Sequence, residues 1–314
     1  MKLAVLIRAH KAPIQLAQLV RALDHDQIDT FAHIDLKVDQ RPFEAAIATS
    51  SQTETMQFIT ARSDLTWGGF SMVQATLKCL REVMSSTSGT MPDYVALLSG
   101  QDYPILSNER ILGFLDDNAG KQFVSYAACP TPFWKDETFD RVKDYNFVDL
   151  KALTWPANKN GSLTRRWPLR LRLANKIANI LSTGRTPPTG WTMYGGSAWW
   201  ILSRDAVEYI LQTIDSNPEI SRYFRWSFHS EEMFYQSILM NSPFRDDLIG
   251  PHEEKLIGDY LWYQQWSSGS PSPDVLGSDD LGRVLASDRM FARKFDIASD
   301  AAVLDAIDRA REQA

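Results

Sequence analysis

The chain has 314 residues, enough for one large domain or two small ones. Hydrophobic residues make up 44% of it and charged residues 23%, which is ordinary for a globular protein with a sizeable core. A net charge of -6 argues against an extended basic surface, so we expect no nucleic-acid partner. Cys79 and Cys129 are the two cysteines, and their spacing predicts neither a disulfide framework nor a zinc site.

The N-terminal residues lack the apolar length and the cleavage site of a signal peptide. No window approaches the continuous apolar stretch that a membrane span needs. We therefore expect a soluble protein of a reducing compartment.

The first half of the chain alternates between strand and helix patterns. Short apolar runs predict buried strands at residues 2–7, 29–35, 93–99 and 121–127. Apolar residues at helical spacing predict helices at 12–23 and 71–84, the second capped by Ser71. This alternation indicates a mainly parallel sheet covered on both faces. Because such sheets bind ligands at the carboxyl ends of their strands, attention falls on Arg8, His10, Asp35 and residues 99–104.

The second half is less regular. Residues 150–192 are rich in Arg, Pro, Asn and Gly, and the stretch at 165–176 is basic and partly amphipathic. A strand at 195–203, a helix at 204–214 and a closing helix at 300–312 are expected. The simplest interpretation is a single domain, 1–314, with an irregular basic insert near 130–190.

Two adjacent carboxylates, Glu231 and Glu232, stand at the start of an apolar and aromatic run. Ser230 is expected to cap a helix there, and acidic residues in a first helical turn stabilise its dipole without any further function. A helix N-terminus also keeps a carboxylate ionised, as a general base must be. Successive helical positions point about 100° apart, so one of the two is expected to face a cleft, and the spacing does not say which.

Other kinds of site are less well supported. His229 with Glu231 and Glu232 would suit a metal-dependent hydrolase, but there is no H-E-x-x-H and no pair of histidines at i, i+4. Dinucleotide-binding and P-loop glycine patterns are also missing. The glycine pairs at 68–69 and 195–196 either let the backbone approach a ligand closely or form turns.

A further acid and two cations lie in the remaining segments. Asp102 follows the strand at 93–99 and is either a turn residue or part of a sugar-nucleotide site. No D-x-D follows that strand, so a diphosphate would need cationic side chains. Arg293 and Lys294 would supply them, unless they form a solvated face.

Several segments in order resemble the core-2/I-branching β-1,6-N-acetylglucosaminyltransferases and their relatives, the peptide O-xylosyltransferases. They are residues 6–25, 31–37, 66–77, 94–105, 194–211, 230–244 and 285–296. The stretches "MNSPF" and "FARKFD" are most similar to xylosyltransferase-like bacterial members. The resemblance implies a GT-A-like α/β fold, with a mainly parallel sheet flanked by helices. It also implies inverting, metal-independent transfer of GlcNAc or xylose from a UDP-sugar to a hydroxyl of a carbohydrate, peptide or lipid-linked acceptor.

The resemblance also assigns roles to residues. Glu232 is expected to be the base, Glu231 its capping partner, and Lys294 the cation that neutralises the diphosphate. The expected donor-binding residues are His10, Asp35, Trp67, Gly68, Asp102, Arg293 and Lys294. The expected acceptor-side residues are Gly196, Ser197, Trp199, Trp200 and Glu231, although strand alternation would place one of the two tryptophans in the core.

The sequence departs from the family pattern at Trp262, where members often carry an Arg. It also lacks the membrane anchor and disulfides of the animal members, which suggests a bacterial cytoplasmic enzyme. The Arg165–Arg172 stretch would suit an anionic membrane surface or a lipid-linked acceptor, or be a solvated helix. A non-catalytic sugar- or nucleotide-binding module is the alternative to a transferase.

Overall fold

The computed structural model describes residues 1–50, 56–85, 91–131, 140–154, 168–250, 261–268, 270 and 272–313. A central sheet has the strand order β10-β6-β9-β4-β1-β2-β3. Its strands are β1 (Leu3–Ala9), β2 (Ile28–Ile34), β3 (Met56–Phe58), β4 (Tyr94–Ser99), β6 (Gln122–Val124), β9 (Trp200–Ser203) and β10 (Leu248–Ile249). The strands β3, β2, β1 and β4 are all parallel, whereas β9 runs antiparallel to β4 and β6.

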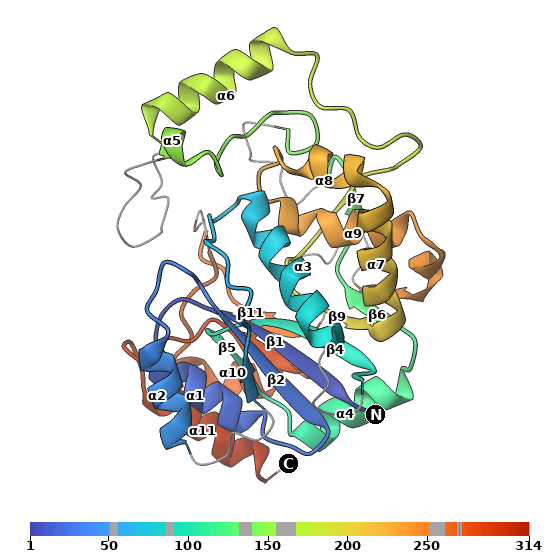
Figure 1. Cartoon of the computed structure of the whole chain (residues 1–314). Helices are drawn as coiled ribbons and strands as arrows, with labels where there is room; N and C mark the ends of the chain where they lie inside the picture. Colours follow the sequence, from blue (N-terminus) through green and yellow to red (C-terminus); the bar gives the residue numbers. More distant parts are fainter. Residues whose placement is uncertain are drawn as a thin grey trace.

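Helices surround this sheet and the smaller sheet described below (Figure 1). They are α1 (Pro13–Ala22), α2 (Arg41–Thr49), α3 (Phe70–Ser85), α4 (Asn108–Asp117), α7 (Arg204–Ser216), α8 (Pro218–Phe224), α9 (Phe234–Met240), α10 (Leu281–Leu285) and α11 (Ala302–Arg311). Every residue of β1 is buried, as expected of a parallel strand covered on both faces. The mainly parallel sheet and its flanking helices confirm the predicted α/β class. No described helix has both the length and the apolar character needed to cross a bilayer.

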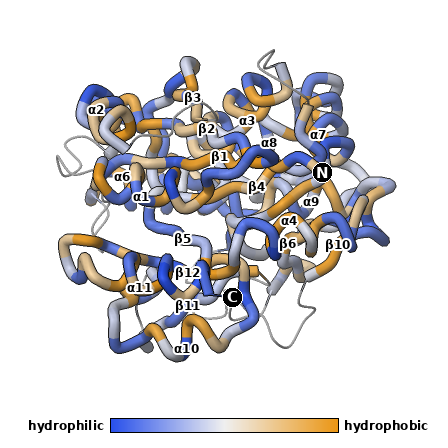
Figure 2. Tube along the Cα trace, turned by 90° about the horizontal axis from the view of Figure 1, so that it is seen from below, coloured by the Kyte–Doolittle hydropathy of each residue, from blue (hydrophilic) through white to orange (hydrophobic). Residues whose placement is uncertain are grey.

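A second, smaller sheet lies beside the first and packs near α10 and α11 (Figure 2). It consists of β11 (Trp262–Gln264), β12 (Phe291–Arg293) and β5 (Asp102–Pro104). The antiparallel pairing of β12 with β5 sets Arg293 opposite Asp102. The short strands β7 (Ala127–Ala128) and β8 (Tyr194–Gly195) form a separate pair, and α5 (Lys151–Thr154) and α6 (Leu169–Leu181) lie at the outer end of the molecule (Figure 1).

Two predicted helix caps are wrong. Ser71 lies inside the first turn of α3, and the carboxylate of Asp149 caps that turn instead, accepting from Ser71 N at 2.9 Å and Ser71 Oγ at 2.7 Å. Ser230 does not open a long helix. It starts a single 3₁₀ turn, Ser230–Glu232, and α9 begins only at Phe234.

The predicted strand at 195–203 is divided between two sheets, because β8 pairs with β7 and the chain joins the central sheet only at β9. In the expected irregular insert, residues 132–139 and 155–167 lie outside the described part, while α5 and α6 are well-formed helices. The division of the chain into domains stays a prediction.

Candidate active site

Three parallel strands end side by side at one edge of the central sheet. Ala9 of β1 pairs with Ile34 of β2, and Arg8 of β1 pairs with Ser99 of β4. The backbone N–H of Asp35 donates to the carbonyl of Ala9 at 2.9 Å. The residues that follow these strands therefore meet at this edge, as the sequence pattern predicts.

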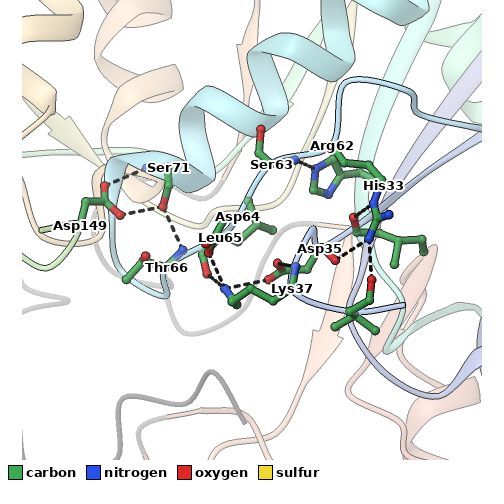
Figure 3. Close-up of polar contacts among 12 residues, drawn as sticks. His33, Asp35, Lys37, Arg62, Ser63, Asp64, Leu65, Thr66, Ser71 and Asp149 are labelled. Carbon is green, nitrogen blue, oxygen red and sulfur yellow. Dashed lines mark hydrogen bonds and ion pairs between the residues drawn. The ribbon is translucent and has the colours of Figure 1, made fainter. Parts of the chain in front are cut away.

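Asp35 is buried and held in place by the segment that precedes α3 (Figure 3). Its Oδ1 accepts from Lys37 N at 3.0 Å, and its Oδ2 lies 3.1 Å from Lys37 Nζ. Lys37 Nζ also lies 3.0 Å from Asp64 Oδ1. The guanidinium of Arg62 donates to the carbonyls of Ile34 and Asp35, both at 2.9 Å. Asp35 thus stands at a fixed position on the strand edge, next to the exposed His10.

A set of buried charged residues, which we call the buried charge chain, lies beneath this edge. Arg8 NH1 contacts Glu231 Oε2 at 2.8 Å, and Arg293 Nε lies 3.1 Å from Asp102 Oδ1. Both guanidinium groups lie over the ring of Trp199, at 5.5 Å for Arg8 and 4.2 Å for Arg293. Trp199 therefore joins the two ion pairs into one continuous set that reaches from β5 and β12 to the Ser230–Glu232 turn.

Three residues that were predicted to contact a ligand are buried in the structure, so these predictions are corrected. Asp102 is fully buried: burial raises the pKa of its carboxyl, and the Arg293 charge opposes that shift. Its second oxygen accepts from the backbone N–H of Ser99, so Asp102 positions Arg293 and cannot touch a donor. Glu231 is likewise buried, on Arg8. Trp200 is fully buried against Tyr235, with ring centroids 5.1 Å apart, and belongs to the core.

Glu232 has a different environment from its neighbour. Its side chain is 27% exposed, against 11% for Glu231. Its Oε2 accepts from Arg141 NH1 at 2.5 Å, and its Oε1 lies 3.6 Å from Nδ1 of His229. His229 has the left-handed backbone conformation, with φ of 48°, directly before the 3₁₀ turn. This turn sends one carboxylate into the interior and leaves the other partly open.

Two predicted glycines serve the packing of the segment that carries Glu232. Gly68 has φ of +75°, and a Cβ there would lie 2.4 Å from the ring of Phe228. The N–H of Gly196 donates to the carbonyl of Glu232 at 2.8 Å, and a Cβ there would lie 2.0 Å from the carbonyl oxygen of Ser125. The close approach that the glycine pairs predict is thus made to the protein's own backbone and rings.

The other predicted side chains border the same segment. Trp67 is 40% exposed, and its ring meets that of His229 edge-on with centroids 4.4 Å apart. Ser197 N donates to Ser125 Oγ at 2.8 Å, and Ser197 Oγ accepts from Trp199 N at 3.2 Å. Trp67 therefore offers an open aromatic surface near Glu232, whereas Ser197 shapes the loop between β8 and β9.

Cations gather where β12 ends. Lys294 Nζ donates to Ser272 Oγ at 2.9 Å, and in the described part of the chain it forms no ion pair with a carboxylate. Burial lowers the pKa of Lys294, and the charges of Arg293 and Lys11 lower it further. Lys11 itself lies 2.6 Å from Asp296. At the position of the family Arg, Trp262 is buried and stacked on Phe291, with centroids 5.3 Å apart, so it adds no charge.

Two functional candidates received no role from the sequence. The strand pattern draws attention to Arg8, which directly follows an apolar run, but gives it no function. Arg141 carries no such signal, because it lies in the irregular insert. The metal alternative is not supported by this geometry: Glu231 faces Arg8 while Glu232 faces Arg141, and among the described residues no three His, Cys, Asp or Glu side chains gather as metal ligands.

Comparison with known proteins shows which family this chain is similar to. The model of the Core-2/I-Branching enzyme family matches residues 3–282. Xylosyltransferase 2 of Rattus norvegicus is 24% identical over 98% of this chain and 33% of its own length. Xylosyltransferase 1 of Homo sapiens is 23% identical over 97% of this chain and 30% of its own length. The chain thus spans about a third of the length of these curated relatives.

Solved structures of glycosyltransferases are also similar. One is the galactosyltransferase LgtC in complex with donor and acceptor sugar analogs, with a TM-score of 0.44 and 10% identity over 99% of this chain and 95% of that one. Another is mouse xyloside xylosyltransferase 1, with a TM-score of 0.36 and 12% identity over 93% of this chain and 97% of that one. Because the family model covers nearly the whole chain and agrees with the ordered motifs, the chain belongs to the Core-2/I-Branching enzyme family of glycosyltransferases.

Proposed function

We propose that this protein transfers GlcNAc or xylose from a UDP-sugar to an acceptor hydroxyl, with Glu232 as the base. The observation that carries the proposal is the unequal burial of two adjacent carboxylates. Glu231 is occupied by Arg8 in the interior, whereas Glu232 is held partly open beside His229 and the exposed Trp67. A base must be fixed in position and still reach its substrate, and Glu232 meets both conditions.

The proposed reaction is a single displacement that inverts the anomeric carbon. The acceptor oxygen forms a bond to that carbon on the face opposite UDP, and its proton passes to Glu232. The bond between the carbon and the diphosphate oxygen breaks, and UDP leaves with the bonding pair. Arg141 holds the Glu232 carboxylate, and its Oε1, turned toward His229, is the oxygen that we assign to the proton.

Negative charge grows on the departing diphosphate, and we assign its stabilisation to Lys294. Its half-buried ammonium repels the nearby charges of Arg293 and Lys11, and an anionic ligand would relieve that repulsion. Arg293 is already paired with Asp102, so its contribution is smaller. In this scheme Lys294 supplies the charge that a divalent metal supplies in other sugar-nucleotide enzymes, and transfer is metal-independent.

His10 and Asp35, at the ends of β1 and β2, are the proposed contacts of the nucleoside. The acceptor would be a hydroxyl of a carbohydrate, a peptide or a lipid-linked glycan, with Trp67 as an aromatic surface for a sugar ring. We also propose that the enzyme acts in the cytoplasm.

The test is UDP release from a panel that contains UDP-GlcNAc and UDP-xylose, measured in EDTA with candidate acceptors. We expect release with one donor, and a fall of about 10²–10⁴-fold in kcat for Glu232→Gln with little change in UDP affinity. Glu208→Gln is the matched control, because Glu208 is an exposed glutamate on α7. It should keep full activity.

Three results would contradict the proposal. Loss of release in EDTA would refute metal independence, and an active Glu232→Gln would remove Glu232 from the chemistry. Calorimetric binding of UDP by the wild type, without turnover of any donor and acceptor pair, would favour a non-catalytic binding module.

A further inference from the structure

Helix α6 presents its apolar side chains to solvent. Spacings of four, four, three and one residues place five of them on one face, since successive helical residues turn by about 100°. We call them the α6 stripe: Leu169, Leu173, Ile177, Ile180 and Leu181, which are 49–81% exposed. An amphipathic helix of a globular protein normally turns such a stripe toward the core. Here the usual orientation is reversed.

The opposite face of α6 is attached to the protein through polar groups. Asn175 Oδ1 accepts from the backbone N–H of Phe147 at 3.0 Å. Asn179 Oδ1 accepts from Tyr145 N at 2.6 Å, and its Nδ2 donates to the carbonyl of the same residue at 3.2 Å. Leu171 is fully buried on this side. These bonds fix which face of the helix points inward, so the exposure of the α6 stripe is built into the packing.

The charge of α6 identifies what its stripe would contact. The helix contains Arg170, Arg172 and Lys176, all exposed, and no acidic residue, although the whole chain has a net charge of -6. On the helical wheel Arg172 and Lys176 lie along one border of the stripe. Among the described residues none of the three forms an ion pair, and Arg170 Nε donates to the carbonyl of Leu153 at 2.9 Å. Two copies joined through this face would bring like charges together.

We propose that α6 docks on an anionic membrane surface, with the α6 stripe in the boundary between headgroups and acyl chains and its cations against lipid phosphates. Apolar and basic residues in this arrangement are typical of helices that lie in the membrane interface. The outer position of α6, away from the central sheet, leaves the stripe accessible (Figure 1). Arg165 and Arg166, part of the predicted basic stretch, lie outside the described residues. Docking of α6 on a membrane would not depend on the sugar-transfer reaction.

Flotation of the whole chain with vesicles tests this directly. We expect binding to vesicles of phosphatidylcholine with phosphatidylglycerol, and much weaker binding to phosphatidylcholine alone. Leu173→Asn/Ile177→Asn should abolish binding. Arg172→Gln/Lys176→Gln should weaken it by about 30-fold, because each cation near an anionic surface contributes about 1 kcal/mol and the variant removes two. Leu285→Asn, an exposed leucine on α10, is the matched control and should bind as the wild type does.

Several outcomes would overturn the proposal. They are the absence of binding to anionic vesicles, equal binding to neutral vesicles, and retained binding by the stripe variant. A dimer in light scattering that becomes monomeric in Leu173→Asn/Ile177→Asn would show instead that a second copy covers the stripe. Circular dichroism of each variant, unchanged from the wild type, would exclude misfolding as the cause of lost binding.

Discussion

Two regions of this molecule depart from ordinary burial in opposite directions. The buried charge chain places Arg8, Glu231 and Asp102 in the interior, where charged residues are rare, while α6 places leucines and isoleucines in solvent. Each buried charge has an opposite charge within 3.1 Å, so the charges of that region are compensated within the protein. The α6 stripe has no comparable internal partner among the described residues. The first region is therefore suited to positioning groups, and the second to an external contact.

The same contrast recurs on a smaller scale between Glu231 and Glu232. One carboxylate is fixed by Arg8 in the interior, and the other is held by Arg141 at the opening. Because Glu231 is fixed in the interior, it helps to hold the backbone of the adjacent Glu232, and so the proposed base, at a set position. Variants of buried and of exposed residues should therefore differ in their effects, and measuring that difference tests this arrangement.

The largest effect is expected from breaking the Arg8–Glu231 pair. Arg8→Met leaves Glu231 buried without a partner and should reduce the free energy of unfolding by about 3–5 kcal/mol. The double variant Arg8→Met/Glu231→Gln should recover part of this loss, because no uncompensated charge remains. Urea denaturation of the double-mutant cycle measures the coupling.

The matched control is the Arg81–Asp215 pair, at 2.6 Å, whose side chains are 46% and 60% exposed. Its coupling should be only about 0.2–1 kcal/mol. Similar couplings for the two pairs would mean that burial does not distinguish the charge chain from a surface ion pair.

A smaller effect, dependent on pH, is expected from His33, which pairs with Arg8 across β1 and β2. Burial, with the Arg8 charge in second place, lowers the pKa of His33 from 6.5 to about 4, and its Nε2 accepts from Ser63 N at 2.9 Å (Figure 3). Between these pH values the unfolded chain binds a proton that the folded chain does not. Stability should therefore be full above pH 6.5 and fall by about 3 kcal/mol as the pH drops toward 4.

Denaturation curves at several pH values measure this loss. His33→Gln keeps a hydrogen-bond acceptor without a titrating group, so the difference between its curve and that of the wild type isolates His33. Parallel pH dependences of the two proteins would refute the assignment.

The smallest effect on stability is expected on α6. Leu173→Asn changes an exposed position and should alter the free energy of unfolding by less than about 0.5 kcal/mol. Leu171→Asn on the same helix replaces a fully buried side chain and should be destabilising by about 2–5 kcal/mol, as large losses of buried apolar groups are. Equal losses measured by urea denaturation would mean that the α6 stripe is buried, and the contrast between the two regions would disappear.

Much of the fold could be predicted from local patterns. The runs that became β1 and β4 are mostly apolar, and strands buried on both faces leave that pattern in a sequence. The strand ends then place His10, Asp35 and Asp102 at one edge. The caps at Ser71 and Ser230 were wrong because capping depends on which group reaches the helix end, and Asp149 reaches α3 from a segment that is distant in sequence.

By itself, the sequence determined the α/β class, the family and the pair of glutamates as the centre of interest, because strand periodicity and motif order are local properties of the chain. Only the tertiary structure decided which glutamate is open, since that depends on Arg8 and Arg141 from remote segments. It also decided that Asp102 and Trp200 are buried and that the apolar face of α6 points outward. Burial and pairing of a side chain are set by the elements that pack on it, and no local pattern records them.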